Sequence, residues 1–177
     1  MTESIGGTPS AWLLTHLELI PPHGRVLDVA CGRGRHALYL ARMGYRVHAV
    51  DREEDAVADL RAAAALERLP LTCEVLDLET DPPPSLGIGL FDAVMVFRYL
   101  HRPLFPSLIE AVAPGGRLIY ETFTVAQALR GRPTNPRFLL KPGELAALAA
   151  PLAIVDAREG DIEGQSIASI VAARPRR

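Results

Sequence analysis

The sequence has little cysteine and no long apolar run. Its two cysteines, Cys31 and Cys73, are too few and too far apart for a disulfide framework or a zinc site. No apolar run reaches the roughly 18 residues that a membrane span requires. Met1 to Ser4 include no basic residue of the kind that begins a signal peptide. We therefore expect a cytoplasmic protein that binds neither a membrane nor a metal.

An excess of positive charge is also absent. The net charge is -2 and basic and acidic residues are interspersed, so we expect no nucleic acid partner. We interpret the basic tail, residues 174–177, as a solvated terminus. The chain has 177 residues, 49% of them hydrophobic, which suits one domain with a full core, and we predict a single domain over residues 1–177.

The most informative stretch is a glycine-rich turn between a strand pattern and a helix pattern. Residues 26–41 read VLDVACGRGRHALYLA, an apolar run followed by Gly32, Gly34 and a helical pattern. Glycine allows a sharp turn and a close approach of a ligand to the backbone, and the N-terminus of the next helix favours an anionic group. Asp28 lies inside the apolar run, where it needs a partner, either loop N–H groups or a ligand amine.

A second acid follows at the spacing expected for nucleoside binding. Nineteen residues after Gly32, the apolar run 46–50 ends in Asp51. A carboxylate there is suited to accept hydrogen bonds from both hydroxyls of a ribose. Strand, glycine turn, helix, strand and acid together indicate the first unit of an α/β nucleotide-binding fold.

The rest of the chain alternates strand and helix patterns and then changes character. This predicts a Rossmann-like, doubly wound, mostly parallel seven-stranded sheet that ends in an antiparallel hairpin, because residues 159–164 are too short a connection for a parallel pair. The expected strands are 26–30, 46–50, 71–78, 91–97, 117–123, 153–158 and 166–173. The expected helices are 9–20, 36–43, 53–69, 104–112 and 141–150, with residues 125–140 a loop or broken helix.

The N-terminal helix, within residues 1–22, has two open interpretations. Ser10 is a possible N-cap, and Trp12, Leu13 and Leu17 lie near one face. Such a helix either lies across the ligand site as a lid or packs on the edge of the sheet.

These features together resemble the class I S-adenosylmethionine-dependent methyltransferases. The run 28–34 resembles their first motif, an acid followed by spaced glycines, and Asp51 and Asp77 match the acids after their second and third strands. Residues 91–94 look like the entry to their fourth strand, and 114–116 (Pro-Gly-Gly) like the turn before the fifth. Within the class, CGRGRHALYLA is most similar to small bacterial enzymes of the tellurite-resistance type. Ala30 departs from the pattern, because many members have glycine there.

The resemblance implies that S-adenosylmethionine is the cofactor and assigns it contacts. Asp28 would orient the loop and the cofactor amino group, and Asp51 would hold the ribose hydroxyls. Asp77 would accept a hydrogen bond from the adenine amino group, with Leu78 beside the ring. The methionine part would be bordered by the loop backbone and the end of the fourth strand, namely by Ala30, Cys31, Gly32, Gly34, Phe97 and Arg98.

The methyl acceptor is less defined by the sequence. Transfer from a sulfonium is an in-line displacement, in which the protein mainly supplies alignment. A hydroxyl acceptor needs a base, for which His101 is a candidate, although we favour the interpretation of a loop histidine bonded to backbone. Tyr99 either lines the substrate pocket or packs. The stretch after the fourth strand lacks the N-P-P-Y or D-P-P-Y sequence of many nucleic acid and protein glutamine methyltransferases, so we expect a small-molecule substrate.

Two alternatives stay open. Residues 32–37 also satisfy the G-x-G-x-x-A pattern of NAD-dependent oxidoreductases, although an acid four residues before the first glycine and a closing antiparallel hairpin are foreign to that pattern. The other alternative is a non-catalytic S-adenosylmethionine-binding subunit that supports a partner protein. For the chain itself we expect a monomer or a homodimer.

Overall fold

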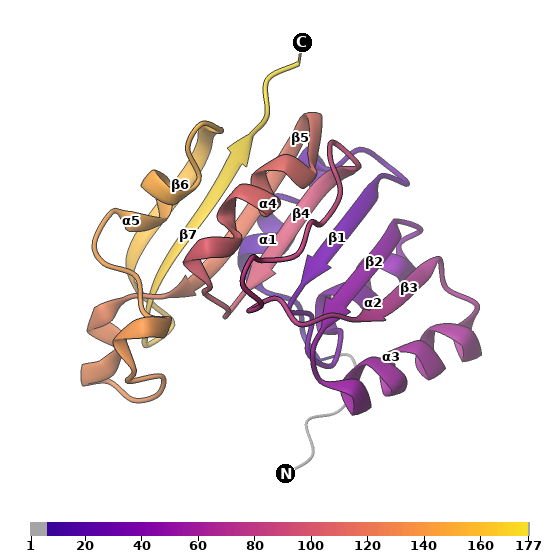
Figure 1. Cartoon of the computed structure of the whole chain (residues 1–177), viewed down its shortest axis with the longest axis horizontal. Coiled ribbons are helices and arrows are strands. Elements are labelled where there is room, and N and C mark those ends of the chain that lie inside the picture. The colour runs from indigo at the N-terminus through magenta and orange to yellow at the C-terminus, as the bar shows by residue number, and fades with distance from the viewer. Residues whose placement is uncertain (1–6, 177) are drawn as a thin grey trace.

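A seven-stranded sheet with helices on both faces forms the protein (Figure 1). The computed structural model describes residues 7–176. The strands are β1 (Arg25–Val29), β2 (Arg46–Asp51), β3 (Leu71–Val75), β4 (Phe91–Phe97), β5 (Val112–Phe123), β6 (Ala153–Ile162) and β7 (Gln165–Ala173). The α-helices are α1 (Ala11–Thr15), α2 (Arg35–Arg42), α3 (Glu54–Glu67), α4 (Phe105–Ala111) and α5 (Glu144–Leu148). Short 3-10 helices are η1 (Leu17–Leu19), η2 (Arg102–Leu104), η3 (Val125–Leu129) and η4 (Pro136–Phe138).

The strand order is β3-β2-β1-β4-β5-β7-β6. Strands β1 to β5 pair in parallel, and β7 pairs antiparallel with both β5 and β6. The predicted Rossmann-like fold, with its closing antiparallel hairpin, is therefore confirmed. Because Val29 is in register with both Val50 and Val96, β1, β2 and β4 end at the same edge of the sheet. Ligand sites of open parallel sheets lie at such an edge.

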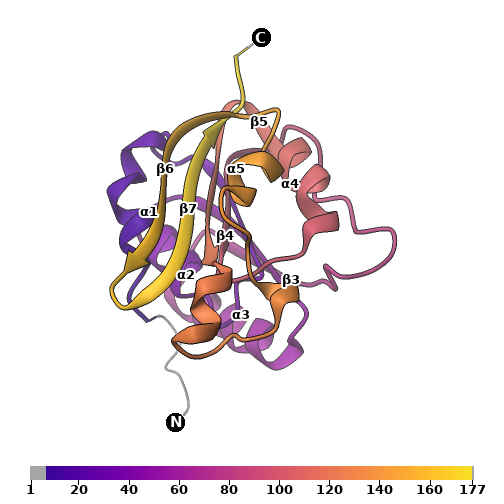
Figure 2. The ribbon, with the colours of Figure 1, turned by 90° about the vertical axis from the view of Figure 1, so that its left-hand side faces the viewer.

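Two apolar layers hold the helices against the sheet. On one face, α1, α2 and α3 contribute Leu13, Leu38 and Leu60, all fully buried. On the other face, α4 and α5 contribute Leu108 and Leu145. Figure 2 shows α1 and α4 on opposite sides of the sheet. Both faces of the central strands are therefore covered, as their nearly continuous apolar sequences require.

The terminal hairpin is tighter than predicted. We expected a loop over residues 159–164, but β6 runs to Ile162 and only Glu163 and Gly164 connect it to β7. Both connecting residues have positive φ, 53° and 78°, which is the requirement of a type I′ turn. The polar residues of 159–162 look like a loop in the sequence because β6 is an edge strand that is exposed along almost its whole length.

Two element boundaries also differ from the prediction. Pro114 to Gly116 were expected to form a turn before the fifth strand, but β5 begins at Val112, directly after α4, and includes them. Gly116 permits this because a Cβ there would lie 3.0 Å from the carbonyl oxygens of Asp92 and Phe91 on β4. The helix expected over 141–150 is shorter, since α5 begins only after Gly143, which has a φ of +70°.

The N-terminal helix is capped as predicted but is shorter than predicted. Ser10 Oγ accepts a hydrogen bond from the N–H of Trp12, which confirms the N-cap. The helix expected over 9–20 is divided into α1 and η1 by His16. Residues 1–6 of the predicted N-terminal segment lie outside the described residues.

Candidate functional site

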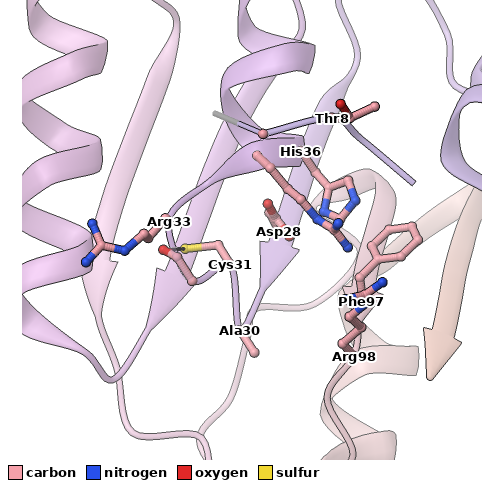
Figure 3. A pocket seen from close by; sticks show the side chains of 11 residues that line it. Thr8, Asp28, Ala30, Cys31, Arg33, His36, Phe97 and Arg98 are labelled. Carbon is pink, nitrogen blue, oxygen red and sulfur yellow. Dashed lines mark hydrogen bonds between the residues drawn. The ribbon is translucent and has the colours of Figure 1, made fainter. Parts of the chain in front are cut away.

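Two adjoining cavities lie at the edge of the sheet where β1, β2 and β4 end. The larger, about 480 Å³, lies over the glycine turn (Figure 3), and the smaller, about 350 Å³, lies beside β2 and the segment after β3. Ala30 and Arg98 line both cavities. The larger is otherwise lined by Gly7, Thr8, Asp28, Cys31, Gly32, Arg33, Arg35, His36 and Phe97. The smaller is otherwise lined by Asp51, Arg52, Glu53, Leu76, Asp77, Leu78, Glu79, Tyr99 and Phe138.

The glycine turn runs between the two cavities in a left-handed backbone conformation. Ala30, Gly32 and Gly34 have φ values of 54°, 53° and 73°. A Cβ added to Gly32 would meet no atom within 4 Å, so the backbone there faces open space that a ligand can enter. A Cβ on Gly34 would collide with the buried side chain of Leu60. Gly32 therefore leaves room beside the backbone, whereas Gly34 lets α2 approach α3 closely.

The conformation of Ala30 predicts that Ala30→Gly stabilises the protein. A left-handed conformation costs an L-residue about 1 kcal/mol, and glycine avoids this cost, although part of the gain is offset by the greater freedom of glycine in the unfolded chain. We expect the free energy of unfolding to rise by about 0.5 kcal/mol, measured by urea denaturation.

Ala37→Gly provides the matched control for this substitution. Ala37 lies inside α2 and is fully buried, so the same exchange should destabilise the protein by about 1 kcal/mol or more. A loss of stability in Ala30→Gly as large as that in Ala37→Gly would contradict the strain assigned to Ala30.

Asp51, at the end of β2, is tied to the glycine turn. Its Oδ2 accepts a hydrogen bond of 2.7 Å from the N–H of Gly32, and its Oδ1 accepts one of 3.0 Å from the N–H of Glu53. Each carboxylate oxygen can accept a further hydrogen bond. The side chain is thus held in one orientation at the wall of the smaller cavity.

Asp28 is a buried acid with an unused oxygen at the wall of the larger cavity. Its Oδ2 has no hydrogen-bond partner among residues 7–176, and the residue is 2% exposed. Burial raises the pKa of Asp28 from its ordinary 3.8 to about 7. An unpartnered polar atom at this depth is costly, so the site is suited to a ligand that donates a hydrogen bond or carries positive charge.

Cys31, which lies between Ala30 and Gly32 in the glycine turn, is not an activated thiol. It is buried, and burial raises its pKa well above the ordinary value, with the carboxylate of Asp28 adding to the effect. A thiolate is therefore disfavoured at neutral pH. Cys31 lines the larger cavity as a small residue.

Asp77 and Leu78, the residues expected at the adenine ring, line the smaller cavity and lie beyond the end of their strand. The strand expected over 71–78 stops at Val75, and Asp77 follows in an irregular segment, where its Oδ1 accepts a hydrogen bond from the N–H of Glu79 at 2.9 Å. Leu78 is buried. Asp51, Asp77 and Leu78 therefore line one cavity.

Phe97 and Arg98 end β4 and face the larger cavity. The ring of Phe97 lies 4.1 Å, between centroids, from that of His36. Arg98 has a left-handed backbone, with a φ of 57°, and its Nη2 donates to Oε1 of Gln165 at 3.2 Å. Its guanidinium also lies over the ring of Phe123, 5.8 Å from the centroid. The Arg98 side chain thus contacts the ends of β5 and β7.

Of the two candidate catalytic residues, one lines a cavity described above and the other does not. Tyr99 lines the smaller cavity, and burial raises the pKa of its hydroxyl above the ordinary value. His101 lines neither cavity. The Tyr99 hydroxyl and His101 Nε2 are both buried without a hydrogen-bond partner among the described residues. Their catalytic roles stay predictions.

The segment before α1 closes one side of the larger cavity. Gly7 and Thr8 line the cavity, and Ser10 holds the segment in place. The N–H of Ser10 donates to Nε2 of His36 at 3.1 Å, and its Oγ donates to Oε1 of Glu121 at 2.8 Å. Burial lowers the pKa of His36 to about 3, so the imidazole is neutral and can accept this bond.

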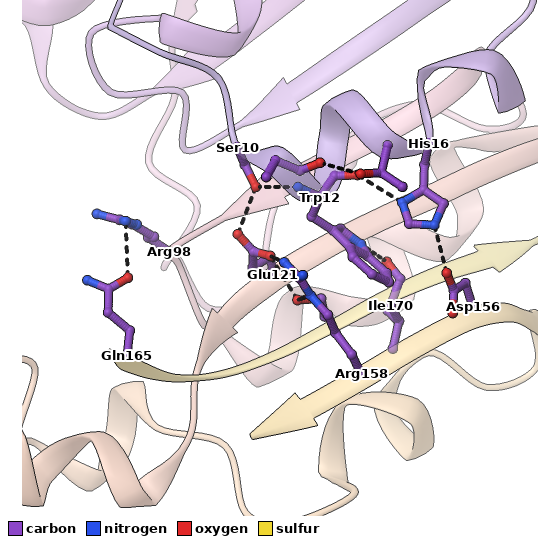
Figure 4. A network of polar contacts seen from close by, with 12 residues as sticks. Ser10, Trp12, His16, Arg98, Glu121, Asp156, Arg158, Gln165 and Ile170 are labelled. Atoms are coloured by element: carbon purple, nitrogen blue, oxygen red, sulfur yellow. Dashed lines mark hydrogen bonds and ion pairs between the residues drawn. The ribbon is translucent and has the colours of Figure 1, made fainter. Parts of the chain in front are cut away.

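Glu121, on β5, is the centre of this network (Figure 4). Besides the Ser10 hydroxyl, its carboxylate accepts hydrogen bonds from Arg158 at 3.0 Å and from Ser169 at 2.8 Å. The guanidinium of Arg158 lies over the Trp12 ring, 4.6 Å from its centroid. The network fastens α1 to β5, β6 and β7. The N-terminal segment therefore packs on the sheet and also borders the site, and whether it moves as a lid stays a prediction.

Several of the residues that line the two cavities were not predicted from the sequence. His36, Glu53 and Glu79 lie within three residues of predicted site residues, and proximity to the motif was a usable signal for them. Thr8 and Phe138 carried no such signal, because each reaches the site from a distant segment.

Comparison with known proteins matches the chain to a protein family. A family model described as "Methyltransferase domain" matches residues 26–116. Hemagglutinin 1 of Eikenella corrodens is 35% identical over 52% of this chain and 32% of its own length. The probable S-adenosyl-L-methionine-dependent methyltransferase TehB of Haemophilus influenzae is 31% identical over 49% of this chain and 30% of its own length. The chain thus spans about a third of the length of these relatives.

A solved structure agrees with the family match at the level of the fold. The structure of TehB from Haemophilus influenzae superposes with a TM-score of 0.77 at 19% identity, and covers 94% of this chain and 62% of its own. The family match includes β1 to β4 and the glycine turn, and the structural match includes the closing hairpin. The chain therefore belongs to the methyltransferase domain family, and it shares the fold of the TehB structure.

Proposed function

We propose that this protein transfers a methyl group from S-adenosylmethionine to a small-molecule acceptor. The observation that carries the proposal is the pair of adjoining cavities at the ends of β1, β2 and β4. One cavity has two acids suited to a nucleoside, Asp51 and Asp77. The other has the open backbone of Gly32 and the unused carboxyl oxygen of Asp28.

The side chains present fit the cofactor. The Oδ2 atom of Asp28 has the position and the unmet hydrogen-bonding capacity to receive the cationic amino group of the methionine part. Asp51 keeps one free acceptor site on each oxygen for a ribose diol, and Asp77 and Leu78 lie together for an adenine ring. When bound, S-adenosylmethionine supplies a methyl group on a sulfonium, and the neutral thioether that remains after transfer is a good leaving group.

The contribution of the protein is alignment. In-line displacement requires the acceptor atom to approach the methyl group from the side opposite the sulfur. A protein that holds the acceptor in this position makes the reaction effectively unimolecular, which lowers its entropic barrier. Phe97 and Arg98 at the end of β4, and Thr8 from the N-terminal segment, border the space next to the methionine part. A thiol or a metalloid oxyanion needs no base in this position, whereas a hydroxyl does. We propose an acceptor from one of these three classes.

Two alternatives have less support. An NAD-dependent oxidoreductase is disfavoured by the family match over residues 26–116 and by the antiparallel β5-β7-β6 arrangement. A non-catalytic cofactor-binding subunit shares the cofactor site but transfers no methyl group. Among the described residues, no helix is long and apolar enough to cross a membrane. Cytoplasmic localisation and a monomeric or homodimeric state stay predictions.

Calorimetric titration with S-adenosylmethionine, S-adenosylhomocysteine and NAD tests the cofactor, and a transfer assay with methyl-labelled S-adenosylmethionine tests the activity. We expect micromolar binding of both adenosyl-sulfur ligands and none of NAD. We further expect label in one class of a panel of small thiols, phenols and metalloid oxyanions. Binding of NAD alone would refute the proposal, and cofactor binding without transfer to any panel member would favour the non-catalytic subunit.

His101→Ala separates the acceptor classes. If the acceptor is a hydroxyl and His101 is its base, turnover should fall by about 10²-fold or more, with unchanged binding of S-adenosylhomocysteine. Full activity of the variant would remove His101 from the mechanism. His23→Ala is the matched control, because His23 is exposed and its imidazole contacts the carbonyl of Gly44, at 3.1 Å, far from the candidate site residues in the sequence.

A further inference from the structure

An aromatic side chain from a distant segment forms part of the smaller cavity. Phe138 ends η4 in the segment between β5 and α5, sixty residues beyond Leu78 in the sequence, and lines this cavity together with Leu78, Leu76 and Tyr99. It is 39% exposed although it is a large apolar residue. Phe138 thus adds an aromatic ring to a cavity wall that already includes Leu76, Leu78 and Tyr99, and a flat apolar ligand face can pack against it.

Arg102 holds the backbone on both sides of Phe138. Its Nη1 donates to the carbonyl of Arg137 at 3.0 Å, and its Nη2 donates to the carbonyl of Leu139 at 2.9 Å. Glu144 in turn fixes the guanidinium with two hydrogen bonds, 2.6 Å from Nε and 2.9 Å from Nη2. A bidentate ion pair of this kind fixes both the position and the orientation of the guanidinium.

Other contacts pin the same segment to the cavity rim. Asn135 Oδ1 accepts from the N–H of Arg137 at 3.0 Å, which caps η4. The guanidinium of Arg137 reaches Glu79 Oε2, at 3.4 Å, on the segment that contains Asp77. The N–H of Leu140 donates to the carbonyl of Phe123 at 2.9 Å. Phe138 is therefore fixed over the cavity at little further entropic cost on binding.

We propose that Phe138 stacks on the nucleobase of the cofactor, and that Arg102 is a positioning residue that presents it. The proposal rests on the proposed function, because it assumes an adenosyl ligand in the smaller cavity. Asp77 would bind the edge of the base and Phe138 would cover one of its faces. Stacking on an aromatic side chain tolerates any base, because every base has a π-face, so Phe138 adds affinity and Asp77 adds selectivity.

Phe138→Ala tests the stacking by calorimetric titration with S-adenosylhomocysteine. We expect about tenfold weaker binding, which is about 1.4 kcal/mol, and near-normal binding for Phe138→Trp. Leu129→Ala is the matched control, since Leu129 lies on the same segment and is 91% exposed, and it should bind normally. Equal binding by Phe138→Ala and the wild type would overturn the proposal. Absence of binding by the wild type would instead refute the proposed function.

A double-mutant cycle tests the positioning role. Arg102→Gln should weaken binding of S-adenosylhomocysteine several-fold in the wild-type background and have no further effect when Phe138 is alanine. An equal loss in both backgrounds would assign Arg102 a general structural role and overturn this part. Glu144→Gln is the second variant for the same cycle, in case Arg102→Gln lowers the melting temperature too far for titration.

Discussion

Asp28→Asn is expected to stabilise the ligand-free protein at neutral pH and to lose this advantage near pH 4. Burial raises the pKa of Asp28 from 3.8 to about 7, so the folded protein holds a proton there that the unfolded chain releases. The contribution of Asp28 to the free energy of unfolding is therefore most favourable below pH 3.8. It becomes less favourable as the pH rises to about 7. About three pKa units correspond to a cost of about 4 kcal/mol, which a neutral asparagine avoids.

Urea denaturation of both proteins at pH 4, 5.5 and 8 measures this effect. The difference in the free energy of unfolding between Asp28→Asn and the wild type should grow with pH and reach a plateau above pH 7. Asp59→Asn is the control, because Asp59 is exposed on α3 and its carboxylate pairs with Arg33 at 3.4 Å on the surface. A difference that does not change with pH would contradict the effect of burial on the pKa of Asp28. The stabilised variant should bind S-adenosylhomocysteine poorly, since this acid is proposed to receive the cofactor amino group.

Asp51→Ala is expected to weaken binding of S-adenosylhomocysteine by about 100-fold or more. The substitution removes two acceptors for the ribose diol, and a hydrogen bond to a charged group contributes about 1.5–3 kcal/mol. It also frees the N–H of Gly32, which Asp51 holds at 2.7 Å, so the glycine turn loses one of its hydrogen bonds to β2, while the bond from the Cys31 N–H to the Val50 carbonyl remains. Calorimetric titration measures the affinity, and thermal denaturation measures the cost of the lost tie.

The control for Asp51→Ala keeps one of the two backbone hydrogen bonds of the side chain. Asp51→Asn keeps one carbonyl oxygen that can accept the 3.0 Å hydrogen bond from the N–H of Glu53, but its NH₂ group can no longer accept from Gly32 or from a hydroxyl. It should therefore bind weakly while it melts closer to the wild type than Asp51→Ala does. Unchanged affinity in Asp51→Ala would mean that the ribose lies elsewhere.

Local pattern predicted much of the fold. The sequence around Asp28, Gly32 and Asp51 combined apolar runs with glycine spacing, and both signals depend on neighbours only a few residues away. The boundaries that the prediction missed have long-range causes. Gly116 continues β5 because β4 passes close to it, and residues 159–162 form a strand because β7 pairs with them. Neither partner is visible in the local sequence.

The sequence by itself determined the strand–turn–helix unit and its acids, because backbone conformation and alternation of apolar residues are local properties. Only the tertiary structure decided which distant residues complete the site. Ser10 and Glu121 meet across 111 residues, and Phe138 reaches the cavity of Asp77 from beyond β5. A hydrogen bond or a stacked ring depends on distance in space, and strand order and packing set that distance. No spacing along the chain could therefore have revealed these contacts.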